Sequence, residues 1–235
     1  MDALVGSFLI KATLPFTASL STENKALVIA ETRPLFFLPH VVSTAVRTHP
    51  GWHLYVFGTP AVHALLDSQC NNYADVTRVT LGTGARMSSR EYSHLLLSER
   101  MWTVIREEHV LVFQADCVLV RGTPAKMLEY DFVGAVCGRM HPQHFVMNGG
   151  LSLRRRSAML RAIDLIRTRH PEMLDEPEDV ALCRVMRQYD FKLPTMEECN
   201  EFAIESVGDP RTAVGLHGTD KYYAPPELVA NLLET

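Results

Sequence analysis

Two polar side chains interrupt an apolar segment in the middle of this sequence. Residues 109–121 read HVLVFQADCVLVR, which places Gln114 and Asp116 between two valine-rich runs. The runs are rich in β-branched residues and too short for helices, so they predict a buried strand of a parallel sheet with Asp116 at its end. Because burying an unpaired carboxylate is costly, we expect Asp116 to contact a ligand, a hydrogen-bond donor or a cleft.

Gln114 and Asp116 are two positions apart, so in an extended chain both side chains lie on the same face. Two oxygens placed in this way can contact a divalent cation or a ribose. Local hydrogen bonding at a strand end is the alternative interpretation. In open α/β sheets, ligands collect at the carboxyl ends of the strands, which makes Asp116 the first candidate for chemistry.

Paired glycines follow an amide side chain at residues 147–150, which read MNGG. Glycine has no Cβ, so the backbone can approach a ligand closely at Gly149, and Asn148 offers both a donor and an acceptor. A tight turn that enters a strand is the alternative.

Four carboxylates fall within residues 175–179, which read DEPED. Glu178 and Asp179 begin a predicted helix, where the helix dipole favours negative charge whatever the function. One of them could act as a general base. The run could equally form a solvated helix end.

An imidazole and an ammonium group stand close together in residues 217–221, which read HGTDK. A neutral His217 can bind a metal ion, and Lys221 can stabilise a departing phosphate. A polar turn is the alternative.

The other basic side chains give no comparable pattern. Arg154, Arg155 and Arg156 could contact phosphate, although a solvated helix start is the simpler interpretation. Six further histidines have no spacing that predicts a metal cluster and are better explained by core or surface packing: His40, His49, His53, His63, His141 and His144.

Composition and missing motifs exclude several classes of protein. A hydrophobic fraction of 47% predicts a globular chain with a substantial core, and a net charge of −4 without a lysine-rich block gives no reason to expect nucleic-acid binding. The sequence has no G-x-S-x-G elbow, no Walker loop and no G-x-G-x-x-G. The five cysteines form no C-x-x-C pair, which predicts reduced structural thiols.

The first 24 residues contain a short apolar run that Lys11 interrupts, without a basic segment before it. We therefore expect an N-terminal extension rather than a signal peptide, and a cytoplasmic protein. No stretch approaches about 18 uninterrupted apolar residues, so no membrane span is expected.

Apolar runs alternate with helical patterns along the rest of the chain. Strands are predicted over 25–30, 53–58, 76–81, the 109–121 segment, 131–137 and 150–153, and helices over 34–46, 60–66, 88–106, from a Ser157 cap, over 178–187 and from Pro225. This alternation predicts an α/β fold, with a mostly parallel central sheet flanked by helices in a single domain of residues 25–235.

Five of these pieces, in this order, resemble glycosyltransferases of the GT-A fold. More closely, they resemble a family of glycosyltransferase-like proteins known only as a domain of unknown function. Its motifs are a first strand ending E-T-R, then F-Q-x-D, N-G-G-[FL]-S-L-R, P-E-D-V and H-G-x-x-K-Y. Here they stand at residues 31–33, 113–116, 148–154, 177–180 and 217–222, so that the resemblance runs from residue 26 to about residue 230.

The resemblance implies a GT-A (Rossmann-like) fold that binds a nucleotide sugar with Mn²⁺ or Mg²⁺. In GT-A enzymes the acids of a D-x-D motif hold the metal and contact the ribose, and here Gln114 stands at the first acid and Asp116 at the second. Glycogenin-like transferases add a late histidine on the metal and a lysine on the diphosphate. His217 and Lys221 are similar, although they are four positions apart instead of six.

The resemblance also assigns the remaining roles. P-E-D-V is similar to the motif that carries the base of inverting GT-A enzymes, which implies Asp179 as the base and Glu178 as the second candidate. Thr32 and Arg33 would face the nucleotide. Asn148 and Gly149 would line the donor sugar or the acceptor.

The expected function is therefore transfer of a sugar from a nucleotide sugar to a hydroxyl group. The acceptor could be a glycan, a lipid-linked molecule, a protein or a small molecule. One alternative is a nucleotidyltransferase on a related sheet, which would release pyrophosphate. The other is a non-catalytic nucleotide-sugar-binding protein, which Gln114 in place of an acid makes credible.

Overall fold

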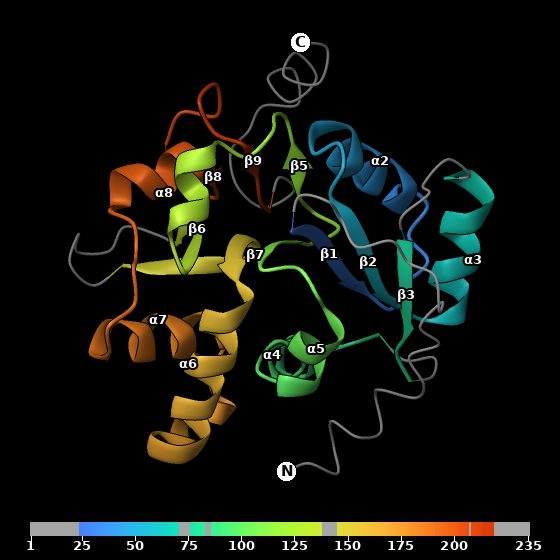
Figure 1. The fold of residues 1–235 in the computed structure, drawn as a ribbon. Coiled ribbons are helices and arrows are strands. Elements are labelled where there is room, and N and C mark those ends of the chain that lie inside the picture. Colours follow the sequence, from blue (N-terminus) through green and yellow to red (C-terminus); the bar gives the residue numbers. More distant parts are fainter. Residues whose placement is uncertain (1–23, 71–75, 83–85, 138–144, 207, 219–235) are drawn as a thin grey trace.

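A six-stranded sheet runs through the middle of the molecule (Figure 1). The computed structural model describes residues 24–70, 76–82, 86–137, 145–206 and 208–218. The strands follow the order β3-β2-β1-β4-β7-β6, and β7 alone runs against the others. Their bounds are β1 (Lys25–Glu31), β2 (His53–Gly58), β3 (Val76–Thr80), β4 (His109–Phe113), β6 (Phe132–Cys137) and β7 (Val146–Arg155).

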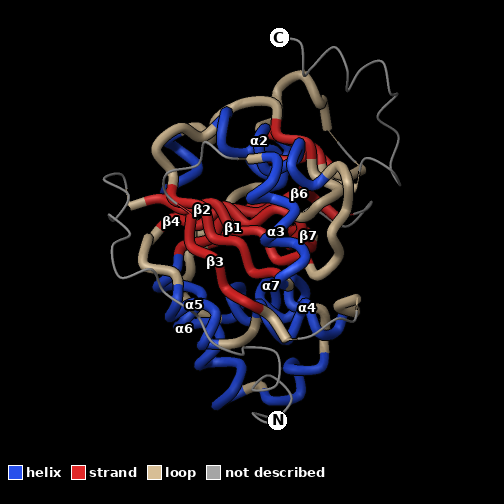
Figure 2. The backbone as a smooth tube through the Cα atoms, turned by 90° about the vertical axis from the view of Figure 1, so that its right-hand side faces the viewer, coloured by secondary structure: helices blue, strands red, loops and turns tan. Residues whose placement is uncertain are grey.

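Helices cover both faces of this sheet, which explains why β1, β2 and β4 are buried almost throughout. One layer consists of α2 (Leu38–Thr48) and α3 (Pro60–Gln69). The other consists of α4 (Ser89–Leu96), α5 (Glu99–Val104), α6 (Arg156–Arg169) and α7 (Glu178–Gln188). Figure 2 shows the sheet between these layers. The predicted α/β class, with a mostly parallel sheet flanked by helices, is confirmed.

The strand order reverses between β1 and β4. From β1 the chain proceeds outward through β2 to β3, and it then returns through α4 and α5 to place β4 on the other side of β1. Such a reversal leaves a crevice at the carboxyl ends of the two central strands, where open α/β sheets bind ligands. The segments that follow β1 and β4 therefore meet at this edge.

A second, three-stranded sheet lies next to the first (Figure 1). It consists of β5 (Val118–Leu119), β9 (Gly215–Leu216) and β8 (Ala203–Ile204) in that order. β9 pairs antiparallel with β5 and parallel with β8, and α8 (Met196–Phe202) packs on β6 and β8. The 109–121 segment is thus two strands in two sheets, not one strand, because the chain turns between β4 and β5.

Other boundaries also differ from the sequence prediction. The helix expected over 88–106 divides into α4 and α5 at Leu97, although its predicted capping box between Ser88 and Glu91 is present. The short strand expected over 150–153 is the ten-residue β7. Ser157 does not cap α6, since its hydroxyl donates a hydrogen bond to Glu108.

Two short elements complete the description. Two short 3-10 helices, η1 (Ala125–Glu129) and η2 (Pro171–Asp175), precede β6 and α7. The helix expected from Pro225 lies outside the described residues, as do residues 1–23. Within the described chain, every helix is too short or too polar to cross a bilayer.

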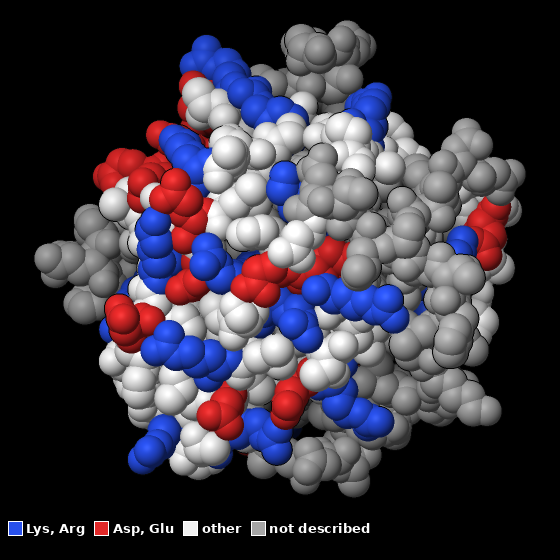
Figure 3. Space-filling view, in the orientation of Figure 1, with Lys and Arg blue, Asp and Glu red and all other residues white. Residues whose placement is uncertain are grey.

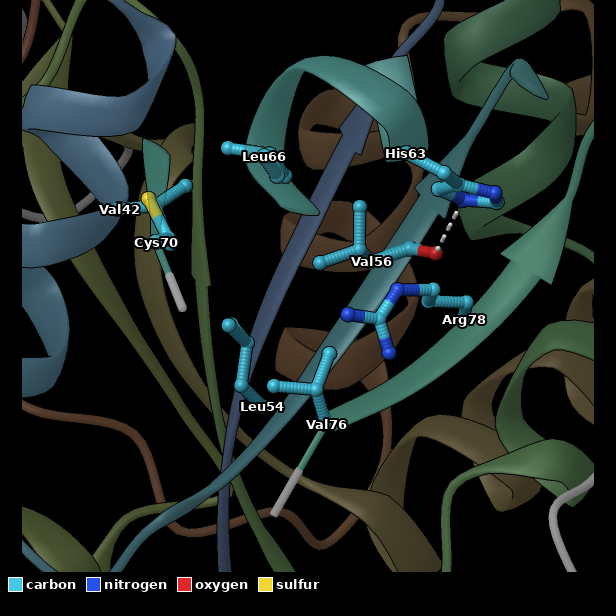
Figure 4. Close-up of a pocket in the computed structure, with 8 residues that line it drawn as sticks. All are labelled: Val42, Leu54, Val56, His63, Leu66, Cys70, Val76 and Arg78. Carbon is cyan, nitrogen blue, oxygen red and sulfur yellow. Dashed lines mark hydrogen bonds between the residues drawn. The ribbon is translucent and has the colours of Figure 1, made fainter. Parts of the chain in front are cut away.

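A small pocket opens at the β3 edge of the sheet (Figure 4). Its lining comes from α2, α3, β2 and β3, and His63 Nε2 there lies 3.3 Å from the carbonyl oxygen of Val56. Its volume of about 10 Å³ leaves space for at most one water molecule. The pocket is too small for a nucleotide, and it lies away from the crevice between β1 and β4.

Candidate functional site

Charged and polar groups gather at the carboxyl end of β1. The Glu31 carboxylate accepts hydrogen bonds from the backbone N–H groups of Thr32 and Arg33, both at 2.9 Å, and from the Arg33 guanidinium at 2.7 and 2.9 Å. The Thr32 hydroxyl accepts a bond from the N–H of Met87, so this side chain holds the chain in place. The side chain of Arg33 is partly exposed. Of Thr32 and Arg33, Arg33 is therefore better placed to contact a ligand.

Asp116 lies within electrostatic reach of this group. The hydrogen bond to Glu31 raises the pKa of Arg33 above its ordinary value, burial opposes that rise, and the charges of Glu31 and Asp116 add to it. The segments after β1 and β4 thus combine one cation with two acids at the same edge. This is the juxtaposition expected from the strand order.

The turn after β4 is anchored on β7. The Gln114 N–H donates to the carbonyl oxygen of Gly150 at 2.9 Å and contacts Cys117 Sγ at 3.3 Å. The Cys117 thiol in turn donates to the same Gly150 oxygen at 3.2 Å. Gln114 and Asp116 are therefore held in a turn, not in an extended strand.

His217 reaches this turn from far along the chain. Its Nε2 atom is 3.2 Å from Gln114 Oε1 and 3.5 Å from Asp116 Oδ1, and the residue is only 6% exposed. The pairing of β5 with β9 explains the approach. Val118 pairs with Leu216 in antiparallel register, so the residue before Val118 and the residue after Leu216 come side by side.

These residues place several metal-binding donor atoms close together. Donor atoms of Asp116, Cys117 and His217 all lie within 4.8 Å of one another. A carboxylate, an imidazole and a thiol are ligands of divalent transition metals, and the amide oxygen of Gln114 adds a further donor beside the imidazole. The residues present therefore fit a divalent cation.

The paired glycines leave room for side chains that come from other elements. A Cβ on Gly150 would lie 2.1 Å from His217 Nε2, and a Cβ on Gly149 would lie 2.0 Å from Glu178 Oε1. The pairing of β6 with β7 shifts between Gly134 and Ala135, which makes a bulge at this point of β7. Bulges commonly occur beside functional sites, where they redirect side chains.

Asn148 and Glu205 connect this bulge to His217. Asn148 accepts a hydrogen bond from the Gly150 N–H at 2.7 Å and donates to Glu205 Oε1 at 3.3 Å. The same Glu205 oxygen lies 3.6 Å from His217 Nδ1. Asn148 therefore contacts the residues of the site directly.

Arg154 forms a buried ion pair beneath the bulge, which corrects the expectation of a solvated helix start. The side chain is fully buried, and its Nη2 lies 3.2 Å from Glu178 Oε1 and 3.0 Å from the Gly149 carbonyl oxygen. Burial raises the pKa of Glu178, and the nearby Arg154 charge opposes that rise. The Ser93 hydroxyl donates a further hydrogen bond to the Glu178 carboxylate. This geometry favours a structural role for Glu178.

Asp179 is the member of the acidic run that contacts the site. Its carboxylate accepts hydrogen bonds from the N–H of Gly149 at 3.2 Å and from its neighbour Val180 at 2.8 Å. Asp175 instead forms an exposed ion pair with Arg90, and Glu176 pairs with Arg184. Asp179 therefore remains the better candidate for a base.

The structure brings together most of the predicted site residues and adds three. Lys221 lies outside the described residues. The sequence analysis did not predict Cys117 and Glu205 as members of the site. It also did not predict the buried position of Arg154. Glu205 carried a usable signal, because it follows the short apolar run of residues 202–204 just as Asp116 follows β4.

The described surface has no single dominant sign of charge in the orientation of Figure 1. Lysine and arginine side chains alternate with aspartate and glutamate over this face (Figure 3).

Comparison with known families gives one match. A family described as "Protein of unknown function (DUF5672)" matches residues 76–217, about 60% of the chain. The matched region includes β4, the bulge of β7, the start of α7 and His217. No curated protein shows significant similarity to the chain.

Replacement of Arg154 by methionine should strongly destabilise the protein, because Glu178 would be left as a buried carboxylate without its partner. Urea unfolding should show a loss of about 3–5 kcal/mol in the free energy of unfolding. Arg90→Met, at the exposed pair with Asp175, is the matched control and should cost about 1 kcal/mol or less. Equal small losses in both variants would contradict the buried-pair assignment.

Replacement of Gly150 by alanine should displace the His217 ring, because the new Cβ would overlap Nε2. Binding of Mn²⁺, measured by calorimetry on the folded variant, should weaken about tenfold or more. Unchanged Mn²⁺ affinity relative to the unmodified protein would show that this ring does not contribute to the metal site.

Proposed function

We propose a function for this chain, which belongs to the DUF5672 family of proteins of unknown function: it is a GT-A-type glycosyltransferase that moves a sugar from a nucleotide sugar to a hydroxyl acceptor. One observation carries the proposal. An arginine, a carboxylate and an imidazole meet at the carboxyl edge of the sheet where the strand order reverses between β1 and β4. Nucleotides bind at this place in open α/β sheets.

Each part of the donor has a counterpart in the site. Arg33 contacts the nucleotide end, where its guanidinium complements the negative charge of the phosphates. Asp116 and His217 would hold Mn²⁺ or Mg²⁺, and Gln114 would contribute its amide oxygen. When bound, the cation offsets the charge that develops on the departing nucleoside diphosphate. Lys221 adds a positive charge for the same diphosphate.

Asp179 activates the acceptor. Its carboxylate takes the proton from the acceptor hydroxyl as that oxygen bonds to the anomeric carbon, and the bond to the diphosphate breaks with its electron pair on the leaving group. Two N–H groups, of Gly149 and Val180, hold the carboxylate in position. Asn148 and Gly149 line the site of the sugar or the acceptor. Glu178 stabilises the bulge of β7 through its ion pair with Arg154.

The cysteines support the proposed cytoplasmic location. All five are free, and three of them are buried. Free buried thiols are typical of reducing compartments, which supports the proposed cytoplasmic location.

Calorimetric titration with a panel of nucleoside diphosphates tests the proposed ligand. At least one of them should bind, and more tightly with Mn²⁺ than without it. Asp116→Asn should remove the dependence on Mn²⁺, whereas Asp209→Asn, at an exposed pair with Arg211, should keep it. If no nucleoside diphosphate binds under either condition, the proposed function is wrong.

Asp179→Asn tests the proposed base. General base catalysis contributes about 10²–10⁴-fold, so release of nucleoside diphosphate from a nucleotide sugar should fall by that factor while nucleotide affinity stays the same. Asp175→Asn, in the same acidic run, is the control and should keep full activity.

Analysis of the products separates the alternatives. Release of pyrophosphate from a nucleoside triphosphate and a sugar phosphate would indicate a nucleotidyltransferase. Binding of a nucleotide sugar without any turnover would indicate a non-catalytic binding protein. Full activity of Asp179→Asn would remove this residue from the mechanism.

A further inference from the structure

Glu205 comes directly after β8, at the same edge of the three-stranded sheet as His217. Ile204 pairs with Leu216 in parallel register, and the His217 N–H donates to the Ile204 carbonyl oxygen at 2.9 Å. The residues that follow these two strands therefore lie side by side. Glu205 is 9% exposed, so a charged side chain is held within the molecule.

The two nitrogens of the His217 ring face different acids. Nε2 lies 3.5 Å from Asp116 Oδ1, and Nδ1 lies 3.6 Å from Glu205 Oε1. Nδ1 is buried and makes no hydrogen bond within the part of the chain that the structure describes. A buried ring nitrogen needs a partner, and Glu205 is the acceptor positioned to supply one.

The contact with Asn148 fixes the carboxylate. Asn148 Nδ2 donates to the same Oε1 atom at 3.3 Å, which directs this oxygen toward the ring. Because Asn148 also accepts from the Gly150 N–H, Glu205 is connected to the bulge of β7 against which the ring packs. Both the orientation of the ring and that of its carboxylate partner thus depend on the same short segment.

We propose that Glu205 is a positioning residue that holds the proton of His217 on Nδ1 and so presents the lone pair of Nε2 toward Asp116 and Cys117. A carboxylate that accepts from the far nitrogen of a metal-binding histidine fixes the tautomer and the ring orientation. In this tautomer Nε2 carries no proton, so in the metal-free protein the Gln114 amide turns its NH₂ group, in place of Oε1, toward the ring nitrogen 3.2 Å away. The consequence for metal affinity rests on the proposed function, whereas the consequence for the tautomer does not.

Glu205→Gln is the informative variant, because it keeps the size of the side chain and an oxygen for Asn148. Its amide can donate to Nδ1, which moves the ring proton to Nε2. In the metal-free protein, ¹⁵N imidazole spectra recorded where the ring is neutral should change from the Nδ1–H to the Nε2–H form of His217. Affinity for Mn²⁺ alone should fall about 10–100-fold.

Two variants serve as controls. Glu201→Gln, in the same region but at an exposed pair with Lys126, should change neither the spectrum nor the Mn²⁺ affinity. Glu205→Asp keeps the carboxylate and should retain the Nδ1–H form. Thermal unfolding of all three variants shows whether the fold is retained.

The outcomes separate the two proposals. A tautomer that is the same in Glu205→Gln as in the unmodified protein overturns the role of Glu205, even if Mn²⁺ affinity falls, since that fall would then reflect a structural change alone. A changed tautomer supports the role of Glu205. If the unmodified protein binds no Mn²⁺ while the tautomer still changes, the metal-dependent function fails and the positioning role stands.

Discussion

The pairing of β9 with two partners is the interaction on which the candidate site depends. Each pairing covers only two residues, yet together they place Cys117 and Glu205 on either side of His217. Such short strands are not stable alone, and buried apolar contacts among Ile204, Ala213 and Leu216 hold them. Gly215 allows the close approach, because a Cβ there would lie 2.8 Å from the Val118 carbonyl oxygen.

A second constraint lies in the bulge of β7. Gly149 and Gly150 have no Cβ, so His217 and Glu178 can approach the backbone closely. Arg154 then holds both the Gly149 carbonyl oxygen and the Glu178 carboxylate from within the core. Asp179, next in sequence to Glu178, is thereby fixed against Gly149. The proposed base and the proposed metal ligands thus share one short piece of backbone.

The sequence predicted those features that depend on local pattern. Apolar runs located the main strands, the Ser88 capping box located the start of α4, and Asp116 was recognisable as an acid after a buried strand. Features that depend on residues distant in the sequence were not predicted. Gln114 and His217 are 103 residues apart, and two-residue strands leave no periodic pattern to read. Arg154 looked solvated because three arginines in a row are usually exposed, and only the fold shows Glu178 beside it.

We propose that the edge between β1 and β4 binds a nucleoside diphosphate with a divalent cation held by Asp116 and His217. Crystals grown with Mn²⁺ and a nucleoside diphosphate, measured at the manganese absorption edge, test it most directly. We expect an anomalous peak in contact with both the Asp116 carboxylate and the His217 imidazole, with the diphosphate beside it. A manganese peak elsewhere on the protein, with none between these two side chains, would contradict it.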